Sequence, residues 1–390
     1  MNNRCTNIFA LGIFAPGILA LGIGILLAVG VMPASPDDWP LFRGGQAQQG
    51  ASSEVLPDNL GIVWKYETGG PIVSSAVVSN GRVFIGSSDD RIHAIDLNSG
   101  EKLWTYLTKA PVEAPPMALR DIVYTGSTDG VLYALDAAKG DLIWKFEAND
   151  KIVGAANWAP GASPDRPLVI VGSYDGFLYG LDAKTGEPQW RYESQNYING
   201  SPAVSAGRAV FGGCDAMIHS VSIKNGSAVS SFEADAYIAA SVAFDGQHAY
   251  VGHYGGQFLC VDVLQQKKVW EYEDRNFPFF SSAAVQGDFV VFGSRDRRVH
   301  CVNRDSGEYK WSFRTRGKVD SSPVICGRDV FVGSDDGRLY RLRLATGELI
   351  QFCEIGAAIL GSPAPARGKI IIGAEDGVVY ALGVKDAKEN

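Results

Sequence analysis

The sequence predicts an all-β fold: an eight-bladed β-propeller with four strands in each blade, preceded by one apolar N-terminal helix. Three observations lead to this prediction, namely a repeat of about 40 residues, hairpin turns marked by Asp and Gly, and strands that read as buried on both faces. Glycine supplies 46 of the 390 residues, about 12% against a usual ~7%, without a collagen-like triplet. This composition is typical of many short strands joined by tight turns.

The first 33 residues are expected to lie outside the propeller. Residues 8–31 carry no charged side chain, and a helix of that length reaches about 36 Å, enough to cross a ~30 Å hydrocarbon core. Arg4 precedes this segment, while Asp37 and Asp38 follow it, which favours a cytoplasmic N-terminus. Residues 1–33 are therefore interpreted as a signal peptide or an uncleaved signal anchor. Either one predicts an extracytoplasmic propeller, and the anchor would hold it at a membrane.

Residues 34–61 read as an extended linker. They contain the segment Trp-Pro-Leu-Phe-Arg-Gly (39–44) and a run rich in Gly and Gln. The propeller is expected to span residues 62–384, and residues 385–390 to form a polar tail.

A glycine opens each unit of the repeat. Five of the seven intervals between these glycines are 40 residues long, and the other two are 46 and 41. A fixed period of this kind is typical of solenoids and propellers. A solenoid would need distinct capping ends, whereas this chain carries its unmatched strand at the front. The opening glycines are Gly86, Gly126, Gly172, Gly212, Gly252, Gly293, Gly333 and Gly373.

Inside the unit, turn and strand positions alternate in a regular way. An Asp follows three residues after the opening glycine in seven units, often with Gly behind it, and this pair between apolar runs predicts a hairpin. The sixth and ninth positions, Ile92 and Ile95 in the first unit, are apolar in every unit. Because apolar residues occur at both odd and even positions, the strand is predicted to be buried on both faces. The turn aspartates are Asp89, Asp129, Asp175, Asp215, Asp296, Asp336 and Asp376.

The last strand of most units ends in a tryptophan, which Ser230 and Gln351 replace in two units. The eighth unit lacks this strand, and a matching one carrying Trp64 occurs at the front of the domain. We therefore expect the first strand to complete the last blade, which would close the ring and remove its exposed sheet edges.

The segments at 133–144 (YALDAAKGDLIW) and 179–190 (YGLDAKTGEPQW) resemble the repeat of the PQQ-like, or quinoprotein, propeller family. The resemblance extends over all eight units. It implies that each tryptophan docks on a turn of the neighbouring blade. The residues concerned are Trp64, Trp104, Trp144, Trp190, Trp270 and Trp311.

The same resemblance implies two functional branches. One holds dehydrogenases that bind PQQ with calcium at the channel mouth. The other holds non-catalytic single propellers such as BamB, which bind proteins during outer-membrane protein assembly. The chain has no adjacent cysteine pair and no long insertions between its units, both features of many of the larger enzymes, so the BamB-like branch is favoured and no cofactor is expected.

The first strand of each unit is expected to line the central channel. Glu113, Asn199 and Asp320, with Lys318 nearby, could bind a ligand there, since carboxylate and amide oxygens are what calcium prefers. They come from non-adjacent units, so a solvated polar channel is the alternative interpretation. The channel positions are Ser74, Glu113, Gly154, Asn199, Ala239, Phe280, Asp320 and Leu360.

No catalytic residue and no metal site is predicted. His93, His219 and His300 occupy the tyrosine position of their units, which indicates packing, and the sequence has no Gly-x-Ser-x-Gly nucleophile setting or standard metal-binding motif. The cysteines follow the repeat, so no disulfide is required.

The net charge of −8 gives no electrostatic basis for binding nucleic acid. The sequence therefore predicts a monomeric, non-catalytic scaffold that binds envelope or membrane proteins through its loops. The alternatives are a small dehydrogenase that uses PQQ and calcium, and an ectodomain that senses a ligand in its channel.

Overall fold

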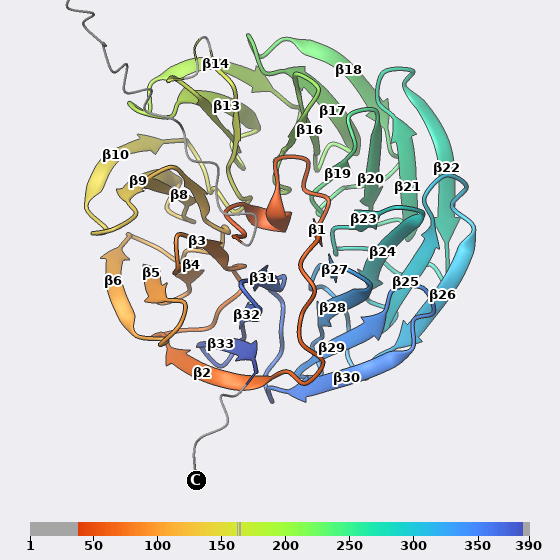
Figure 1. Ribbon diagram of the computed structural model, residues 1–390. Coiled ribbons are helices and arrows are strands. Elements are labelled where there is room, and N and C mark those ends of the chain that lie inside the picture. Colours follow the sequence, from red (N-terminus) through yellow and green to blue (C-terminus); the bar gives the residue numbers. More distant parts are fainter. Residues whose placement is uncertain (1–37, 162, 164, 385–390) are drawn as a thin grey trace, which may run out of the picture. The chain divides into compact units, whose positions relative to one another are not determined.

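The computed structural model describes residues 38–161, 163 and 165–384, which fold into eight antiparallel sheets arranged as a ring (Figure 1). Each sheet, or blade, has four ring strands, numbered here from the channel outward. The fold class predicted from the sequence is confirmed. The apolar helix expected over residues 8–31 and the polar tail at 385–390 lie outside the described residues. Within the described ranges, no helix has the length and apolar character needed to cross a membrane.

Blades 1 to 4 follow one another along the chain. Blade 1 contains β3 (Val77–Ser79), β4 (Arg82–Ser87), β5 (Arg91–Asp96) and β6 (Lys102–Leu107). Blade 2 contains β7 (Met117–Leu119), β8 (Ile122–Gly126), β9 (Val131–Asp136) and β10 (Leu142–Glu147). Blade 3 contains β11 (Asn157–Ala159), β12 (Leu168–Gly172), β13 (Phe177–Asp182) and β14 (Pro188–Glu193). Blade 4 contains β15 (Ala203–Ser205), β16 (Arg208–Gly212), β17 (Met217–Ser222) and β18 (Ala228–Glu233).

Blades 5 to 8 complete the ring. Blade 5 contains β19 (Ala243–Phe244), β20 (His248–Gly252), β21 (Gln257–Asp262) and β22 (Lys267–Glu273). Blade 6 contains β23 (Ala284–Gln286), β24 (Phe289–Ser294), β25 (Arg298–Asn303) and β26 (Tyr309–Arg314). Blade 7 contains β27 (Val324–Cys326), β28 (Asp329–Gly333), β29 (Arg338–Arg343) and β30 (Leu349–Glu354). Blade 8 contains β31 (Ala364–Ala366), β32 (Lys369–Gly373), β33 (Val378–Gly383) and, from the front of the domain, β2 (Gly61–Glu67).

The ring closes through the pairing of its first and last strands. β2 runs antiparallel to β33, with Trp64 opposite Ala381 and Tyr66 opposite Val379. The closing strand predicted from the sequence is therefore confirmed.

The core lies between neighbouring blades. The second and third strands are buried along most of their length, as in β9, where Leu132 and Leu135 have no exposed surface. The outer strand buries mainly its tryptophan, and the residues before it are exposed, as in β10. This difference follows from position, because the middle strands contact a blade on each side and the outer strand borders solvent.

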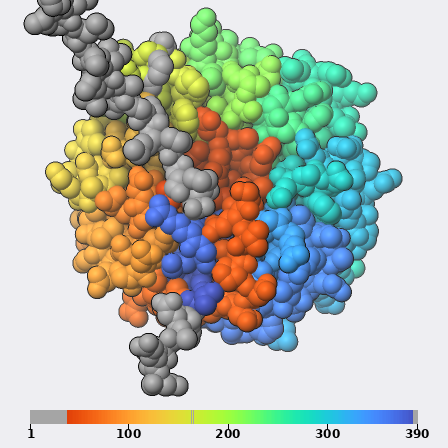
Figure 2. Space-filling model, viewed as in Figure 1, coloured from red at the N-terminus to blue at the C-terminus, as the bar shows by residue number. Residues whose placement is uncertain are grey.

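Residues 38–60, here called the strap, lie across one face of the ring and cover the end of the central channel (Figures 1 and 2). The strap contains a 3-10 turn, η1 (Phe42–Gly44), and a short strand, β1 (Ala51–Ser52), that pairs in parallel with β27. Most of the segment read as a linker thus packs on the propeller.

The strap is bound to the ring mainly through its backbone. Its carbonyl oxygens accept hydrogen bonds from backbone N–H groups of the innermost strands, whose inner edges would otherwise be unpaired. These bonds reach six blades. The donor and acceptor pairs are Val78 and Trp39, Ala118 and Pro40, Val204 and Gln46, Phe244 and Ala47, Val285 and Gln49, and Ile325 and Gly50.

Arg43 holds the strap at the centre of the ring. Its side chain is 1% exposed, and its guanidinium donates to the carbonyl oxygens of Ala283 (2.6 Å) and Ser322 (3.1 Å). Burial lowers the pKa of Arg43. The backbone of Arg43 is left-handed at φ 61°, which turns its side chain toward blades 6 and 7.

Candidate functional site

Each of the six predicted docking tryptophans lies against the blade that follows it in the ring. The indole N–H donates to a backbone carbonyl oxygen in the turn between the third and fourth strands of that blade. The donor–acceptor pairs are Trp64–Leu97 (2.9 Å), Trp104–Ala137 (3.2 Å), Trp144–Ala183 (3.0 Å), Trp190–Ile223 (2.9 Å), Trp270–Arg304 (2.7 Å) and Trp311–Leu344 (2.8 Å).

A glycine in the same turn leaves room for each indole. At Gly140, with φ +76°, a Cβ atom would lie 2.6 Å from the Trp104 ring, closer than real Cβ contacts occur. Where Ser230 replaces the tryptophan, the corresponding turn residue is Gln266, also left-handed at φ 52°. The turn thus has no glycine where the preceding blade has no indole. The tryptophan of one blade and the turn glycine of the next blade therefore occur together.

The three histidines at the tyrosine position connect neighbouring blades. With Nε2 protonated, His93 donates to Asp89 (3.2 Å) in its own blade, and its Nδ1 accepts from the Tyr66 hydroxyl (3.0 Å). The same arrangement holds for Tyr192–His219–Asp215 and Tyr272–His300–Asp296. Both ring nitrogens are therefore used in packing, as the repeat predicted.

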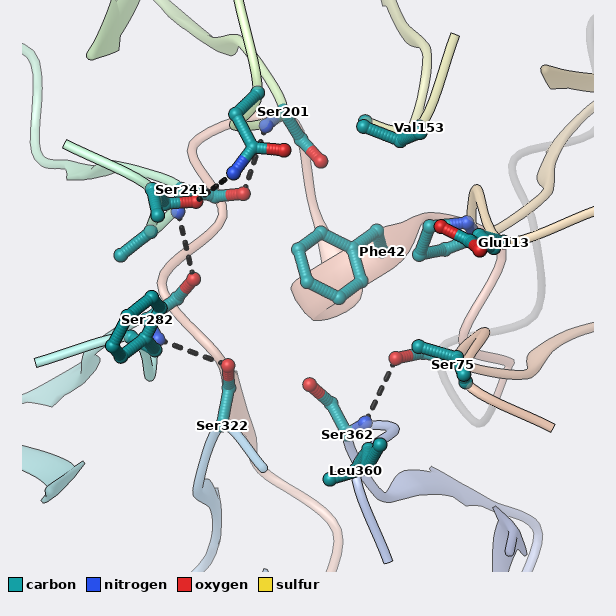
Figure 3. Close-up of a pocket in the computed structure, with 17 residues that line it drawn as sticks. Phe42, Ser75, Glu113, Val153, Ser201, Ser241, Ser282, Ser322, Leu360 and Ser362 are labelled. Carbon is teal, nitrogen blue, oxygen red and sulfur yellow. Dashed lines mark hydrogen bonds between the residues drawn. The ribbon is translucent and has the colours of Figure 1, made fainter. Parts of the chain in front are cut away.

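A collar of serine side chains surrounds the channel. In five serines, Ser75, Ser201, Ser241, Ser282 and Ser322, the hydroxyl oxygen accepts the backbone N–H of the corresponding residue in the preceding blade, as from Ser201 to Ser241 (2.8 Å) and from Ser282 to Ser322 (2.9 Å). Figure 3 shows several of these bonds around the cavity. The donor–acceptor pairs are Ala155–Ser201, Ser201–Ser241, Ser241–Ser282, Ser282–Ser322 and Ser362–Ser75. Blade 2 has Pro115 at this position, which supplies neither an N–H nor a hydroxyl.

The channel holds a cavity of about 170 Å³ beside the collar. Phe42 of the strap lies at its centre in Figure 3, with Glu113 to one side. Of the predicted channel positions, six line this cavity: Glu113, Gly154, Asn199, Ala239, Phe280 and Leu360.

Two of the predicted channel positions, Ser74 and Asp320, do not line this cavity. Val73, not Ser74, lines the cavity, and in blade 3 Val153 lines it together with Gly154. Ser74 is instead buried at 1% exposure, and its hydroxyl donates to the Ala114 carbonyl oxygen. The predicted position in blade 1 is thus one residue out of register, and the lining residues of the ring precede the first strand of their blades rather than lying in it.

The four candidate ligand residues do not form one site. Glu113 and Asn199 line the cavity, whereas Lys318 and Asp320 are not among its lining residues. The Asn199 side-chain oxygen accepts from the Tyr174 hydroxyl at 2.8 Å. Both carboxylate oxygens of Asp320 accept from the Arg295 guanidinium at 2.8–3.1 Å.

This donor set does not fit PQQ with calcium. Calcium needs six to eight converging oxygens, but the oxygens of Asn199 and Asp320 already accept hydrogen bonds from protein groups. The cavity is also smaller than the ~300 Å³ at which ligand pockets usually begin. Among the described residues, the one cluster of three metal-type ligands is Asp274, Asp296 and His300, outside the cavity lining. The five described cysteines are unpaired.

An arc of aromatic side chains borders the channel on the face opposite the strap, here called the open face. Tyr174 stacks on Tyr197 (ring centroids 5.0 Å apart), and Tyr254 contacts both Tyr237 (6.4 Å) and Phe280 (4.6 Å) edge-on. Tyr197, Tyr237 and Tyr254 are about half exposed. These five residues form the aromatic arc.

The Arg295 guanidinium extends this arc, lying 3.7 Å from the Phe280 ring centroid. The sequence reasoning missed the arc, although Tyr174 and Tyr254 occupy the same position of their repeats, directly before the turn residue. That recurrence was the available signal.

Comparisons with known proteins agree with this architecture. Residues 112–388 match the family described as "Beta-alanine-activating enzyme, beta-propeller", and residues 57–155 match the one described as "Outer membrane protein assembly factor BamB". A segment of 89 residues is 28% identical to the lanthanide-dependent methanol dehydrogenase of Methylacidiphilum fumariolicum (strain SolV). That segment is 23% of this chain and spans only 14% of the enzyme's length.

Solved structures from both functional branches share the fold. BamB from Moraxella catarrhalis is 22% identical, with a TM-score of 0.69 over 85% of this chain and 100% of that one. Quinohemoprotein alcohol dehydrogenase from Comamonas testosteroni is 16% identical, with a TM-score of 0.74 over 92% of this chain and 82% of that one. A europium-containing methanol dehydrogenase is 14% identical, with a TM-score of 0.74 over 90% and 98% of the two chains. The repeat, the closed eight-bladed ring and the matched families together establish that this chain belongs to the PQQ-like β-propeller family.

Proposed function

We propose that this chain is a non-catalytic scaffold that binds proteins through the open face of its ring, in the manner of BamB-like propellers. This proposal rests on the observation that the central channel is covered at one end and partly filled. The strap covers one end, Phe42 reaches into the cavity, and the serine hydroxyls around it are engaged by backbone N–H groups. The cavity that remains is too small for a whole ligand, so what the molecule offers to others is its outer surface and the mouth of the channel.

The open face has the composition of a protein-binding surface. Tyr and Arg are enriched among residues that dominate binding energy at protein interfaces. Tyr197, Tyr237 and Tyr254 are each about half exposed. Tyr254 contacts Phe280, and the Arg295 guanidinium lies over the Phe280 ring. Their mutual contacts reduce the side-chain entropy that a partner would otherwise have to remove on binding.

An extracytoplasmic setting is part of this proposal. It rests on the uncharged segment 8–31, preceded by Arg4 and followed by Asp37 and Asp38. Envelope or outer-membrane protein assembly would then supply the partner. Mass spectrometry of the mature N-terminus tests whether residues 1–33 are retained, and membrane fractionation tests the anchor. Recovery of the intact chain from the cytoplasmic fraction would contradict the setting.

Site-specific photo-crosslinking in intact cells tests the scaffold function. A photoreactive residue in place of Tyr237 should give a discrete crosslinked product, identified by mass spectrometry. The matched position is Tyr309, which is equally exposed but belongs to the outer strand β26. Labelling that is equal and non-specific at both positions would contradict a binding face at the channel mouth.

A small quinoprotein dehydrogenase is the second candidate, favoured by the similarity to the methanol and alcohol dehydrogenases. The purified chain would be mixed with PQQ and either Ca²⁺ or La³⁺, and dye reduction followed with alcohols and sugars. We expect no turnover and no shift of the unfolding midpoint, because the oxygen donors do not converge. Sustained turnover would replace the scaffold function with this one.

A further inference from the structure

We propose that the mouth of the channel binds an extended peptide segment that inserts a Lys or Arg side chain into the cavity beside Glu113. This inference rests on the scaffold function proposed above and specifies the chemistry of the partner.

The charge of the cavity favours a cationic side chain. Of the residues that line it, Glu113 is the one with an ionisable carboxylate or amine. In the described part of the chain the Glu113 carboxylate has neither a hydrogen-bond nor an ion-pair partner. A half-buried carboxylate without a partner is stabilised by an opposite charge that binds beside it.

Two other carboxylates near the mouth, Asp320 and Asp335, differ in their partners. Arg295 forms a bidentate ion pair with Asp320, with N–O distances of 2.8–3.1 Å. Burial and the nearby Asp320 raise the pKa of Asp335, while Lys318 acts to lower it. The buried Oδ1 of Asp335 has no hydrogen-bond partner among the described residues, and its raised pKa favours the neutral form. Asp335 does not line the cavity, so Glu113 is the carboxylate that a cation inside the cavity would meet.

The size and walls of the cavity suit one long side chain. Its volume of about 170 Å³ is below the ~300 Å³ typical of pockets for whole ligands. Val73, Val153 and Leu360 contribute apolar surface, and the Phe42 ring lies at the centre (Figure 3). Lys and Arg lay an aliphatic stem along apolar surface while their charged end stays polar, and an aromatic ring face attracts the cation.

The aromatic arc would hold the peptide on either side of that side chain. It begins next to the cavity, because Phe280 lines it and Tyr174 is bonded to Asn199 in its wall. Burial, with smaller effects from Cys214 and Glu113, raises the pKa of Tyr174. Pre-ordered tyrosines supply large contact area at low entropic cost, so sequence specificity would come mainly from the inserted cation.

Selection from a random dodecapeptide phage library tests this inference on the purified full-length chain in detergent. We expect Lys and Arg to be enriched about threefold to fivefold at one central position, the size of effect that a partly exposed ion pair gives. The same selection on the Glu113→Gln variant should lose this enrichment. Glu375→Gln, a change at an exposed carboxylate on the same face, is the control and should keep it.

Synthetic peptides then supply a direct measurement by fluorescence anisotropy. The selected peptide and its versions with central Gln or Glu are titrated against each variant, and circular dichroism confirms that all variants fold. No enriched peptide, no preference for a cation, or a preference that persists in Glu113→Gln would each overturn the inference. The scaffold function would survive those results, because it fails separately if photo-crosslinking finds no specific product.

Discussion

Trp64 lies opposite Ala381 in the closing pair β2–β33, and its indole N–H donates to the carbonyl oxygen of Leu97 in blade 1 (2.9 Å). One residue of the first ring strand thus completes blade 8 and docks on blade 1. The closure of the ring depends on the same side chain that fills the space between its first and last blades.

Replacing this side chain should therefore weaken the whole ring. Trp64→Ala removes a large buried side chain and is expected to lower the free energy of unfolding by about 3–5 kcal/mol. Trp64→Phe retains most of the packing but loses the indole hydrogen bond. Loss of that bond should lower the free energy of unfolding by about 1 kcal/mol, in addition to the effect of the smaller ring. Urea unfolding followed by fluorescence measures both. Equal losses for the two variants would contradict docking as the cause.

The glycine under each indole gives a sharper test. Gly140→Ala places a Cβ atom 2.6 Å from the Trp104 ring, whereas Gly207→Ala at the same φ of +76° meets no atom within 4 Å. The control should lose about 1 kcal/mol from backbone strain alone, and Gly140→Ala a further 1–3 kcal/mol from overpacking. The difference in unfolding free energy isolates the indole contact, and two equal losses would argue against it.

The serine collar predicts that the loss of stability on replacing a serine by alanine depends on the position of that serine. Ser241→Ala leaves the buried Ser201 N–H without its acceptor and should cost about 1–3 kcal/mol. Ser362 is similarly buried, but no N–H group of the described chain donates to its hydroxyl, so Ser362→Ala should cost less than about 1 kcal/mol. Thermal unfolding of the two variants compares them. A larger loss for Ser362→Ala would contradict the collar.

The buried His93, which hydrogen-bonds Tyr66 and Asp89, predicts that the free energy of unfolding depends on pH. Burial lowers the pKa of His93, although Asp89 acts in the opposite direction. As the pH falls, His93 therefore binds a proton in the unfolded chain before it does so in the folded chain. The free energy of unfolding decreases as the pH drops from about 6.5 toward the lowered pKa of His93 in the folded chain. The His93→Tyr variant with Tyr66→Phe copies the neighbouring pair Phe146 and Tyr179 and should remove this contribution.

Urea unfolding midpoints between about pH 7.5 and pH 5 measure the effect as a difference between wild type and variant. Taking this difference removes the contribution of the carboxylates to the pH dependence, because they titrate in both proteins. An unchanged pH dependence in the double variant would mean that another group is responsible.

Most of the ring could be predicted because its determinants recur. Trp144 and its partner turn at Gly186 follow the same spacing as the other blades, and the unmatched strand at Trp64 identifies the closure. Side-chain patterns of this kind are visible in a single sequence when eight copies can be compared. Even the departures are informative, since Ser230 and Gln266 change together.

The strap could not be predicted in the same way. It bonds to the ring through the carbonyl oxygens of residues such as Gln46 and Ala47, and every residue type carries that group. Its Gly and Gln content therefore reads as a linker. The burial of Arg43 also has no sequence signal, because its acceptors are backbone carbonyls rather than a carboxylate.

The channel positions were predicted only in part, because they precede the strands of their blades. Val73 and Ser74 precede β3, which begins at Val77, so the alternation of side chains along a strand does not fix which of them faces the channel. In blade 1 the pattern Val-Ser-Ser at 73–75 offers small or apolar residues at each candidate position. The repeat alone therefore does not distinguish Val73 from Ser74.

The pairing of Gly61 with Gly383 brings the two ends of the ring together as if they were the arms of an ordinary hairpin. A short turn could join them, and the chain could then be opened at any other loop to give a circular permutant. Such a permutant would separate the strap from the ring, so that the strap could be supplied as a free peptide and its affinity for the channel measured directly.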